Sequence, residues 1–198
     1  MYKYVFKRWI DIIISLLAMP FFIPILIIVA PLIWIDDPGP IFYNAPRLGY
    51  KGKVFKMYKF RSMKVNAPDI RNADGSTYNG DNDPRVTRIG RILRKTSVDE
   101  IPQFLNVLKG DMSLIGPRPN LPSVPFNKLP KIEKQRLLVR PGITGYNQAY
   151  YRNSVSADEK FKNDVYYVRN LNFSLDIKIL VQTVKSVLKK ENINMDQR

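Results

Sequence analysis

The sequence of 198 residues contains no cysteine and no histidine. The absence of cysteine excludes disulfides and thiol nucleophiles, and the absence of both residue types excludes Cys/His zinc sites. It also excludes imidazole bases. If the protein is an enzyme, carboxylates, lysines, tyrosines or a bound metal must handle its protons and supply its nucleophile.

Acidic residues are also scarce relative to basic ones. Aspartate and glutamate together number 17 against 32 lysines and arginines, which gives a formal net charge of +15. Such an excess predicts an anionic partner, whether nucleic acid, anionic lipid or a phosphate-bearing substrate. Hydrophobic residues make up 45% of the chain, enough to build a packed core, and the length suits one domain with an appendage.

One long stretch, residues 12–35, carries no charge. As a helix it would extend about 36 Å, enough to cross a hydrocarbon core of about 30 Å. It is too long for a cleavable signal peptide, and no small-residue cleavage site precedes the next charges. Proline stands at positions 20, 24 and 31. Because each proline removes a backbone donor, we expect a bend near the middle, at Pro20 and Pro24.

Basic residues flank this stretch on both sides. Lys3, Lys7 and Arg8 precede it, and several lysines and arginines follow within residues 47–61. Because positive charge favours the cytoplasmic side, the pattern favours a re-entrant helix-break-helix that returns to its own face. A spanning anchor with a proline kink is the alternative. We expect residues 1–37 to form the membrane anchor and residues 38–198 a cytoplasmic domain.

The remaining sequence predicts an α+β fold that is mainly helical. Residues 41–43 and 54–58 predict the strands of a small β-hairpin, and residues 66–84 predict a mobile surface loop. Helical spacing predicts two helical pieces within 85–110 and a last helix over 177–188. The lysine-flanked apolar stripe of that last helix suits an amphipathic interfacial helix on an anionic bilayer. The stripe is equally compatible with a helix that packs on the core of the domain.

Two adjacent carboxylates, Asp99 and Glu100, follow a strongly basic segment. Carboxylates in such surroundings suit nucleophilic or acid–base work on a phosphate ester with a divalent cation. A purely structural interpretation is also open, because Ser97 and Glu100 have the spacing of a capping box. Pro102 weakens it, since proline belongs in the first turn and would start the helix nearer Asp99.

Three further segments offer phosphate-binding cations. Arg118 stands between two prolines on a stiff backbone, which suits bidentate binding of phosphate but is also typical of a rigid surface turn. Arg140 precedes a Pro-Gly-x-Thr-Gly turn that matches no known nucleotide fingerprint. Lys59 and Arg61 form a basic pair beside an aromatic residue, where a solvated strand end is the alternative.

Taken in order, these segments resemble the bacterial monotopic phosphoglycosyl transferases, also called the bacterial sugar transferase family. The resemblance covers nearly the whole chain, and its most specific part runs from residue 88 to 119. The matching motifs are Lys7-Arg8-x-x-Asp11, Pro38-Gly39-Pro40-x-Phe42, Arg47-x-Gly49, Tyr58-Lys59-Phe60-Arg61-Ser62-Met63, Arg88-Ile89-Gly90-Arg91-x-Leu93-Arg94-Lys95-Thr96-Ser97-x-Asp99-Glu100-Ile101-Pro102-Gln103, Asn106-Val107-Leu108-Lys109-Gly110-Asp111-Met112-Ser113-Leu114-Ile115-Gly116-Pro117-Arg118-Pro119 and Arg140-Pro141-Gly142-Ile143-Thr144-Gly145.

The resemblance implies transfer of a sugar-1-phosphate from a UDP-sugar to polyprenol (undecaprenyl) phosphate, with release of UMP, as the first step of glycan or polysaccharide synthesis. It implies that Asp99 is the nucleophile of a covalent intermediate, that Glu100 assists it, and that Mg²⁺ bridges Asp99 and the diphosphate. The phosphate-binding candidates it gives are Arg94 and Arg118, followed by Lys59, Arg61 and Arg140. We expect a helix start near Asp99 to lower its pKa and keep it ionised.

The expected location is the cytoplasmic face of a bacterial inner membrane, in contact with the lipid bilayer. A membrane-tethered, non-enzymatic binder of anionic lipid or nucleic acid is the alternative. The sequence has no nucleic-acid motif, so we expect no nucleic-acid partner. Two departures from the family pattern stand out. Ile23 precedes Pro24 where relatives have serine, and residues 146–152 differ from the usual motif, so the sequence names no particular sugar.

Overall fold

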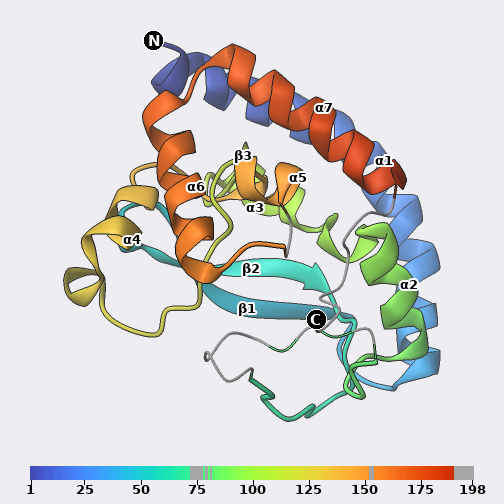
Figure 1. Ribbon diagram of the computed structural model, residues 1–198. Coiled ribbons are helices and arrows are strands. Elements are labelled where there is room, and N and C mark those ends of the chain that lie inside the picture. Colours follow the sequence, from blue (N-terminus) through green and yellow to red (C-terminus); the bar gives the residue numbers. More distant parts are fainter. Residues whose placement is uncertain (72–77, 79, 81, 152–153, 190–198) are drawn as a thin grey trace.

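The computed structural model describes residues 1–198 except 72–77, 79, 81, 152–153 and 190–198 (Figure 1). The prediction of a mainly helical α+β fold with a small hairpin is confirmed. Parts of the predicted 66–84 loop, and Arg152 in the 146–152 departure, lie outside the described residues. In chain order the elements are η1 (Tyr2–Phe6), α1 (Lys7–Asp36), β1 (Phe42–Leu48), η2 (Tyr50–Gly52), β2 (Val54–Phe60), α2 (Arg88–Thr96), η3 (Val98–Glu100), α3 (Gln103–Lys109), β3 (Ser113–Ile115), η4 (Phe126–Lys128), α4 (Lys131–Arg136), β4 (Gly142–Thr144), α5 (Tyr146–Tyr150), α6 (Ala157–Asn170) and α7 (Phe173–Lys189).

The β-hairpin pairs β1 with β2 in antiparallel register, with Phe42 opposite Phe60 and Leu48 opposite Val54. Helix α3 is fixed to β2 by the buried side chain of Asn106. Its amide nitrogen donates to the Lys56 carbonyl at 2.8 Å, and its amide oxygen accepts from the Tyr58 backbone nitrogen at 2.9 Å. One side chain therefore satisfies two backbone groups of the strand and holds the helix that follows the Asp99 turn.

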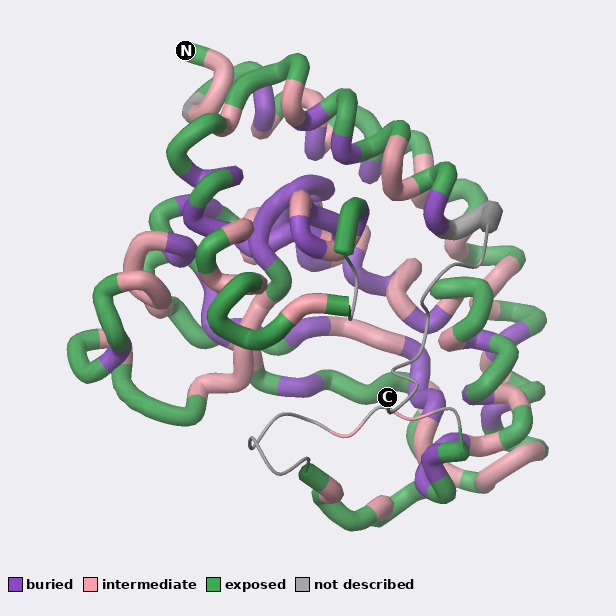
Figure 2. The backbone as a smooth tube through the Cα atoms, viewed as in Figure 1, coloured by how far each residue is buried: buried purple, intermediate pink, exposed green. Residues whose placement is uncertain are grey.

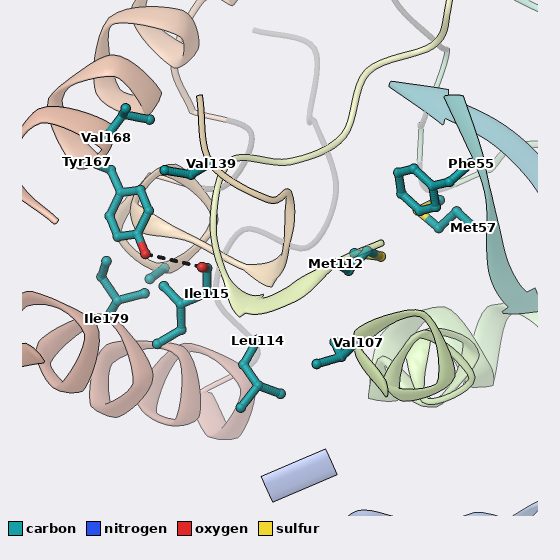
Figure 3. Packing of buried hydrophobic residues seen from close by; sticks show 11 residues of the cluster. Phe55, Met57, Val107, Met112, Leu114, Ile115, Val139, Tyr167, Val168 and Ile179 are labelled. Carbon is teal, nitrogen blue, oxygen red and sulfur yellow. Dashed lines mark hydrogen bonds between the residues drawn. The ribbon is translucent and has the colours of Figure 1, made fainter. Parts of the chain in front are cut away.

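A second, two-stranded sheet joins two short segments that the sequence did not predict as strands. Strand β3 pairs in parallel with β4, with Ser113 opposite Gly142 and Ile115 opposite Thr144. The main core surrounds β3 (Figure 3), and it contains Val107, Met112, Ile115, Tyr167 and Ile179. The buried Tyr167 hydroxyl lies within hydrogen-bond distance of two acceptors. Its oxygen is 3.1 Å from the Ile115 carbonyl oxygen and 2.7 Å from an Asp176 carboxylate oxygen. Those bonds attach α6 and α7 to the sheet.

Helix α1 is one continuous helix and not the predicted helix-break-helix. It runs from Lys7 to Asp36 with Pro20, Pro24 and Pro31 inside it. The predicted break is therefore absent, but Figure 1 shows that the helix axis bends part-way along. A proline removes one backbone bond and displaces the preceding turn, so it can bend a helix without ending it. Among the described helices, α1 is the one long and apolar enough to cross a membrane.

The beginning of α1 is bonded to the rest of the chain through charged and polar side chains. The Lys7 ammonium lies 2.8 Å from an Asp176 carboxylate oxygen on α7. The guanidinium of Arg8 donates to the Val107 carbonyl at the end of α3. The Asp11 carboxylate accepts from the Leu114 backbone nitrogen at 3.0 Å.

The end of α1 is bonded to the same domain. The Asp36 carboxylate accepts from the Ile89 backbone nitrogen at 2.8 Å, and Asp37 pairs with Arg61. Val29 and Ile33 pack in a small core with residues of β2 and α2. Both ends of α1 are thus attached to residues 38–198.

Apolar side chains cover the outward surfaces of α1 and α7. In Figure 1, α7 is drawn in front of the first part of α1, to which Asp176 is joined through Lys7, and Figure 2 shows exposed residues along both helices. On α7, Ile179 and Asp176 are buried while Ile177, Val181 and Val184 are exposed, so this helix packs on the core and also presents an apolar outer face. The side chain of Leu188 lies outside the described residues. Exposed apolar residues of α1 include Trp9, Ile13, Leu17, Phe21, Ile27 and Trp34.

A buried ion pair between α4 and α6 generates a stability prediction. The Arg136 guanidinium donates to an Asp164 carboxylate oxygen from Nε at 2.9 Å and from Nη2 at 2.5 Å, and both side chains are only 4% exposed. Replacing Arg136 by methionine leaves the Asp164 charge buried without its partner, so we expect the free energy of unfolding to fall by about 3–5 kcal/mol. Denaturant unfolding in detergent measures this loss. Lys131→Met, at an exposed position of the same helix, is the control and is expected to change stability by less than about 0.5 kcal/mol.

Candidate functional site

The carboxylates Asp99 and Glu100 lie in the tight turn η3, between the end of α2 and the start of α3. Helix α2 ends because Ser97 adopts the left-handed conformation, with φ of 57°. The predicted capping box is absent, since the Ser97 side chain makes no capping bond and Glu100 bonds elsewhere. Helix capping therefore does not explain why these two carboxylates stand here.

Cations from two distant segments surround the pair. The Lys59 ammonium, near the end of β2, lies 2.5 Å from Glu100 Oε1 and 3.9 Å from Asp99 Oδ2. The Arg118 guanidinium approaches Glu100 Oε1 at 3.5 Å. The Arg118 side chain is itself 58% exposed, so its charge also faces solvent. A site that opens to solvent and holds two carboxylates among cations is suited to binding a phosphate group.

Arg94 belongs to the same site, and Ser62 positions it. Arg94 Nε lies 3.0 Å from Ser62 Oγ, and the Arg94 charge favours the ionised form of Asp99. This arrangement requires α2 to approach the chain at residue 62 closely. A Cβ atom at Gly90 would lie 2.0 Å from the Ser62 carbonyl oxygen, so only glycine fits there.

The two neighbouring carboxylates have opposite pKa shifts. Burial raises the pKa of Asp99, which is 7% exposed, and the Glu100 charge adds to the increase, against the opposing effects of Lys59, Arg94 and Arg118. Burial also acts to raise the pKa of Glu100, but Lys59 and Arg118 outweigh it and lower that pKa to about 2.

The expectation that the pKa of Asp99 is lowered is therefore wrong. It assumed that a helix begins near Asp99. Instead α3 begins at Gln103, and the burial of Asp99 outweighs any dipole effect. Burial thus acts against the charge of Asp99, while Glu100 remains ionised.

Two predicted phosphate ligands lie elsewhere. Arg61 is buried and binds the end of α1, with its guanidinium on Asp37 and its Nε 2.6 Å from the Pro40 carbonyl oxygen. Arg140 donates to the Gly110 carbonyl at 2.8 Å, beyond the far end of α3. Of the seven candidates, the structure brings together Asp99, Glu100, Lys59, Arg94 and Arg118.

No sequence motif singled out Arg136, which holds the Arg118 segment in place. Besides its pair with Asp164, the Arg136 guanidinium donates to the Arg118 carbonyl at 2.8 Å. The arginine stands in the short helix α4, and its partners are 18 and 28 residues away along the chain. Ser62 was likewise missed as a positioning residue, although it belongs to a motif that the resemblance includes.

The carboxylates fit a magnesium ion that is shared with a substrate. Within the described parts of the chain there is no group of three or more acidic ligands that would hold a metal by itself. Mg²⁺ typically binds one or two carboxylates and completes its coordination with substrate phosphates and water. Asp99 and Glu100 supply that minimum, and Glu100 is already engaged by Lys59 and Arg118.

Comparison with known proteins identifies the same family that the sequence resembles. A sequence model of the bacterial sugar transferase family matches residues 2–190. The UDP-N-acetylgalactosamine-undecaprenyl-phosphate N-acetylgalactosaminephosphotransferase of Aeromonas hydrophila is 40% identical over 187 residues, which are 92% of this chain and 43% of the relative. The chain thus spans less than half the length of that relative.

Shorter relatives match over most of their own length. The exopolysaccharide production protein PSS of Rhizobium leguminosarum bv. phaseoli is 40% identical over 194 residues, 93% of this chain and 96% of the relative. The uncharacterized sugar transferase EpsL of Bacillus subtilis is 48% identical over 158 residues, 78% of this chain and 73% of the relative. With a family match over residues 2–190 and relatives at least 40% identical that it covers over most of their length, this chain belongs to the bacterial sugar transferase family.

Proposed function

We propose that the protein transfers a sugar-1-phosphate from a UDP-sugar to polyprenol phosphate and releases UMP. The observation that carries this proposal is the buried Asp99 beside a Glu100 that Lys59 and Arg118 hold. The names of relatives support the substrate class, since the relative of Aeromonas hydrophila is an undecaprenyl-phosphate N-acetylgalactosaminephosphotransferase and that of Salmonella typhimurium an undecaprenyl-phosphate galactose phosphotransferase.

In the proposed reaction Asp99 is the nucleophile. An oxygen of its carboxylate attacks the phosphorus that bears the sugar. The bond between that phosphorus and the bridging oxygen breaks, and UMP leaves with the electron pair. A phosphate oxygen of the polyprenol phosphate then attacks the same phosphorus, which forms the lipid-linked diphosphate and returns the Asp99 carboxylate. Two successive displacements suit substrates that arrive from water and from the membrane.

The surrounding cations reduce the repulsion between a carboxylate and a diphosphate. Lys59 and Arg118 hold Glu100 ionised and in place, and both can also face the entering phosphates. Arg94 acts on Asp99 from the α2 side and favours its ionised form. Asp99, assisted by Glu100, would hold a magnesium ion together with the substrate phosphates, and that ion would supply further neutralisation of the diphosphate charge.

We further propose that α1 is re-entrant and that the site faces the cytoplasm at the bacterial inner membrane. A helix that crosses the bilayer places its ends about 30 Å apart on opposite faces. Here Lys7 and Asp37, at the two ends, bond to residues of one domain. The bend of α1 and the exposed apolar faces of α1 and α7 support insertion from one side. UDP-sugars are cytoplasmic, so the site must be reached from there.

Replacing Asp99 by asparagine tests the role of the nucleophile. The amide is a poor nucleophile and cannot carry the charge, so we expect UMP release from a panel of UDP-sugars with undecaprenyl phosphate to fall on the order of a thousandfold or more. The matched control is Asp158→Asn, on the exposed first turn of α6, which should retain wild-type turnover. Full turnover in the Asp99 variant would contradict the mechanism.

Metal removal tests the part assigned to magnesium. We expect EDTA to abolish UMP release and added Mg²⁺ to restore it, because the diphosphate charge would otherwise repel Asp99. The thermal midpoint without substrate should remain unchanged by EDTA, since the described residues contain no metal site built from protein ligands alone. Undiminished UMP release in excess EDTA would contradict the proposed role of magnesium.

Cysteine labelling tests the topology, since the chain has no cysteine of its own. Lys3→Cys and Pro38→Cys place one thiol beside each end of α1. In intact cells a membrane-impermeant maleimide should label neither site, and both should react once the membrane is permeabilised. If one of the two sites reacts in intact cells, α1 is a spanning helix.

A further inference from the structure

Two neighbouring cavities lie beside the beginning of α1, away from the Asp99 site. Their volumes are about 200 Å³ and 210 Å³, and Tyr50 and Arg140 line both. The first cavity extends to Lys53 and Gly110, and the second extends to the start of α1 at Lys7 and Arg8. We refer to the two together as the Arg140 cavity.

The walls of the Arg140 cavity carry an excess of positive charge. Five cationic side chains line it, namely Lys3, Lys7, Arg8, Lys53 and Arg140. The lining carboxylates are Asp11 and Asp111. When Asp176, the partner of Lys7, is added to these carboxylates, five positive charges face three negative ones. The walls thus carry more positive than negative charge, which suits an anionic group such as the singly charged phosphodiester of a phospholipid.

Two of these cations are held by neutral groups at the end of α3. Arg8 donates to the Val107 and Leu108 carbonyls at 2.6 Å and 3.0 Å, and Arg140 donates to the Gly110 carbonyl at 2.8 Å. These bonds satisfy the last carbonyls of the helix and fix both guanidinium groups. They do not cancel the charges, and the two guanidinium groups repel one another. An anion between or beside them would relieve that repulsion.

The cavity also has an apolar wall where the membrane-facing surface begins. Leu138, Val139 and Leu171 line its second part. Next to Arg8 in the chain, Trp9 is 62% exposed, and it begins the apolar outer surface of α1. Tryptophan and basic residues together are typical of the level of lipid headgroups. A ligand with a phosphate and attached apolar chains matches both walls.

This cavity lies too far from Asp99 to hold either reacting phosphate. Lys53 precedes β2, and Lys59 stands six positions further along the same strand, a separation of about 20 Å. Helix α3 also separates the two sites, because Asp99 precedes its beginning and Gly110 follows its end. The phosphate bound near Arg140 is therefore a second phosphate, which does not take part in the transfer.

We propose that the Arg140 cavity binds the phosphate of an anionic membrane phospholipid and thereby fixes the beginning of α1 at the headgroup level. The expected phosphate ligand Arg140 is thus assigned to a lipid instead of the sugar donor. The proposal depends on attachment to the membrane and not on sugar transfer. Its failure would consequently leave the proposed enzymatic function untouched.

The test is native mass spectrometry of the full chain in detergent micelles, titrated with phosphatidylglycerol. We expect one phosphatidylglycerol to remain bound to the wild type. Arg140→Gln should weaken its binding about fivefold, the loss expected for one basic residue at the headgroup level. Arg140→Lys, which retains the charge, should stay within about twofold of the wild type. The matched control is Arg91→Gln, at an exposed position of α2, and it should bind as the wild type does.

Three outcomes would overturn the proposal. Equal losses in Arg140→Gln and Arg91→Gln would mean a general charge effect. Equally tight binding of phosphatidylcholine with the same acyl chains would mean that the apolar wall alone binds. Displacement of phosphatidylglycerol by millimolar inorganic phosphate would make this a site for free phosphate. Circular dichroism checks the fold of each variant. If Arg140→Gln does not fold, Lys53→Gln, at an exposed position in the same wall, takes its place with the same expected loss.

Discussion

The contact between Lys59 and Glu100 is the interaction on which the site depends. It joins the end of the β-hairpin to the turn between α2 and α3, which are 41 residues apart along the chain. By holding Glu100 ionised at its own position, Lys59 leaves the neighbouring Asp99 buried among cations but less tightly paired. Burial raises the pKa of Asp99 and the cations oppose that increase, so the charge of Asp99 is stabilised best when further positive charge enters with the substrate.

The membrane helix and the site are supported by the same elements. The end of α1 packs on β2 and α2 and binds Arg61, two residues after Lys59. The beginning of α1 caps the carbonyls at the end of α3, whose other end follows the Asp99 turn. A shift of α1 would therefore disturb both β2, which carries Lys59, and α3, which follows the Asp99 turn. In the proposed reaction, this construction would couple the depth of α1 in the bilayer to the position of Asp99.

Local sequence patterns predicted the elements that local forces determine. The hairpin, the helical pieces around α2 and α3, and the apolar α1 follow from alternation, helical spacing and hydrophobic length. The parallel pairing of β3 with β4 was missed, because its partners are 29 residues apart and each strand has three residues. Motifs singled out Asp99, Glu100, Lys59, Arg94 and Arg118, which the structure brings together. They could not show that Arg61 binds Asp37 or that Arg140 binds Gly110, because partner choice is tertiary. The prediction that the pKa of Asp99 is lowered was wrong for the same reason, since the burial of a side chain depends on the whole fold.

The central claim is that Asp99 carries the sugar phosphate between the two substrates. Intact-protein mass spectrometry after incubation with Mg²⁺ and the cognate UDP-sugar, without polyprenol phosphate, tests it most directly. The account predicts a mass increase of one sugar phosphate that maps to Asp99 and disappears when undecaprenyl phosphate is added. An enzyme that turns over normally yet forms no such adduct, or forms it on a residue other than Asp99, would contradict the account.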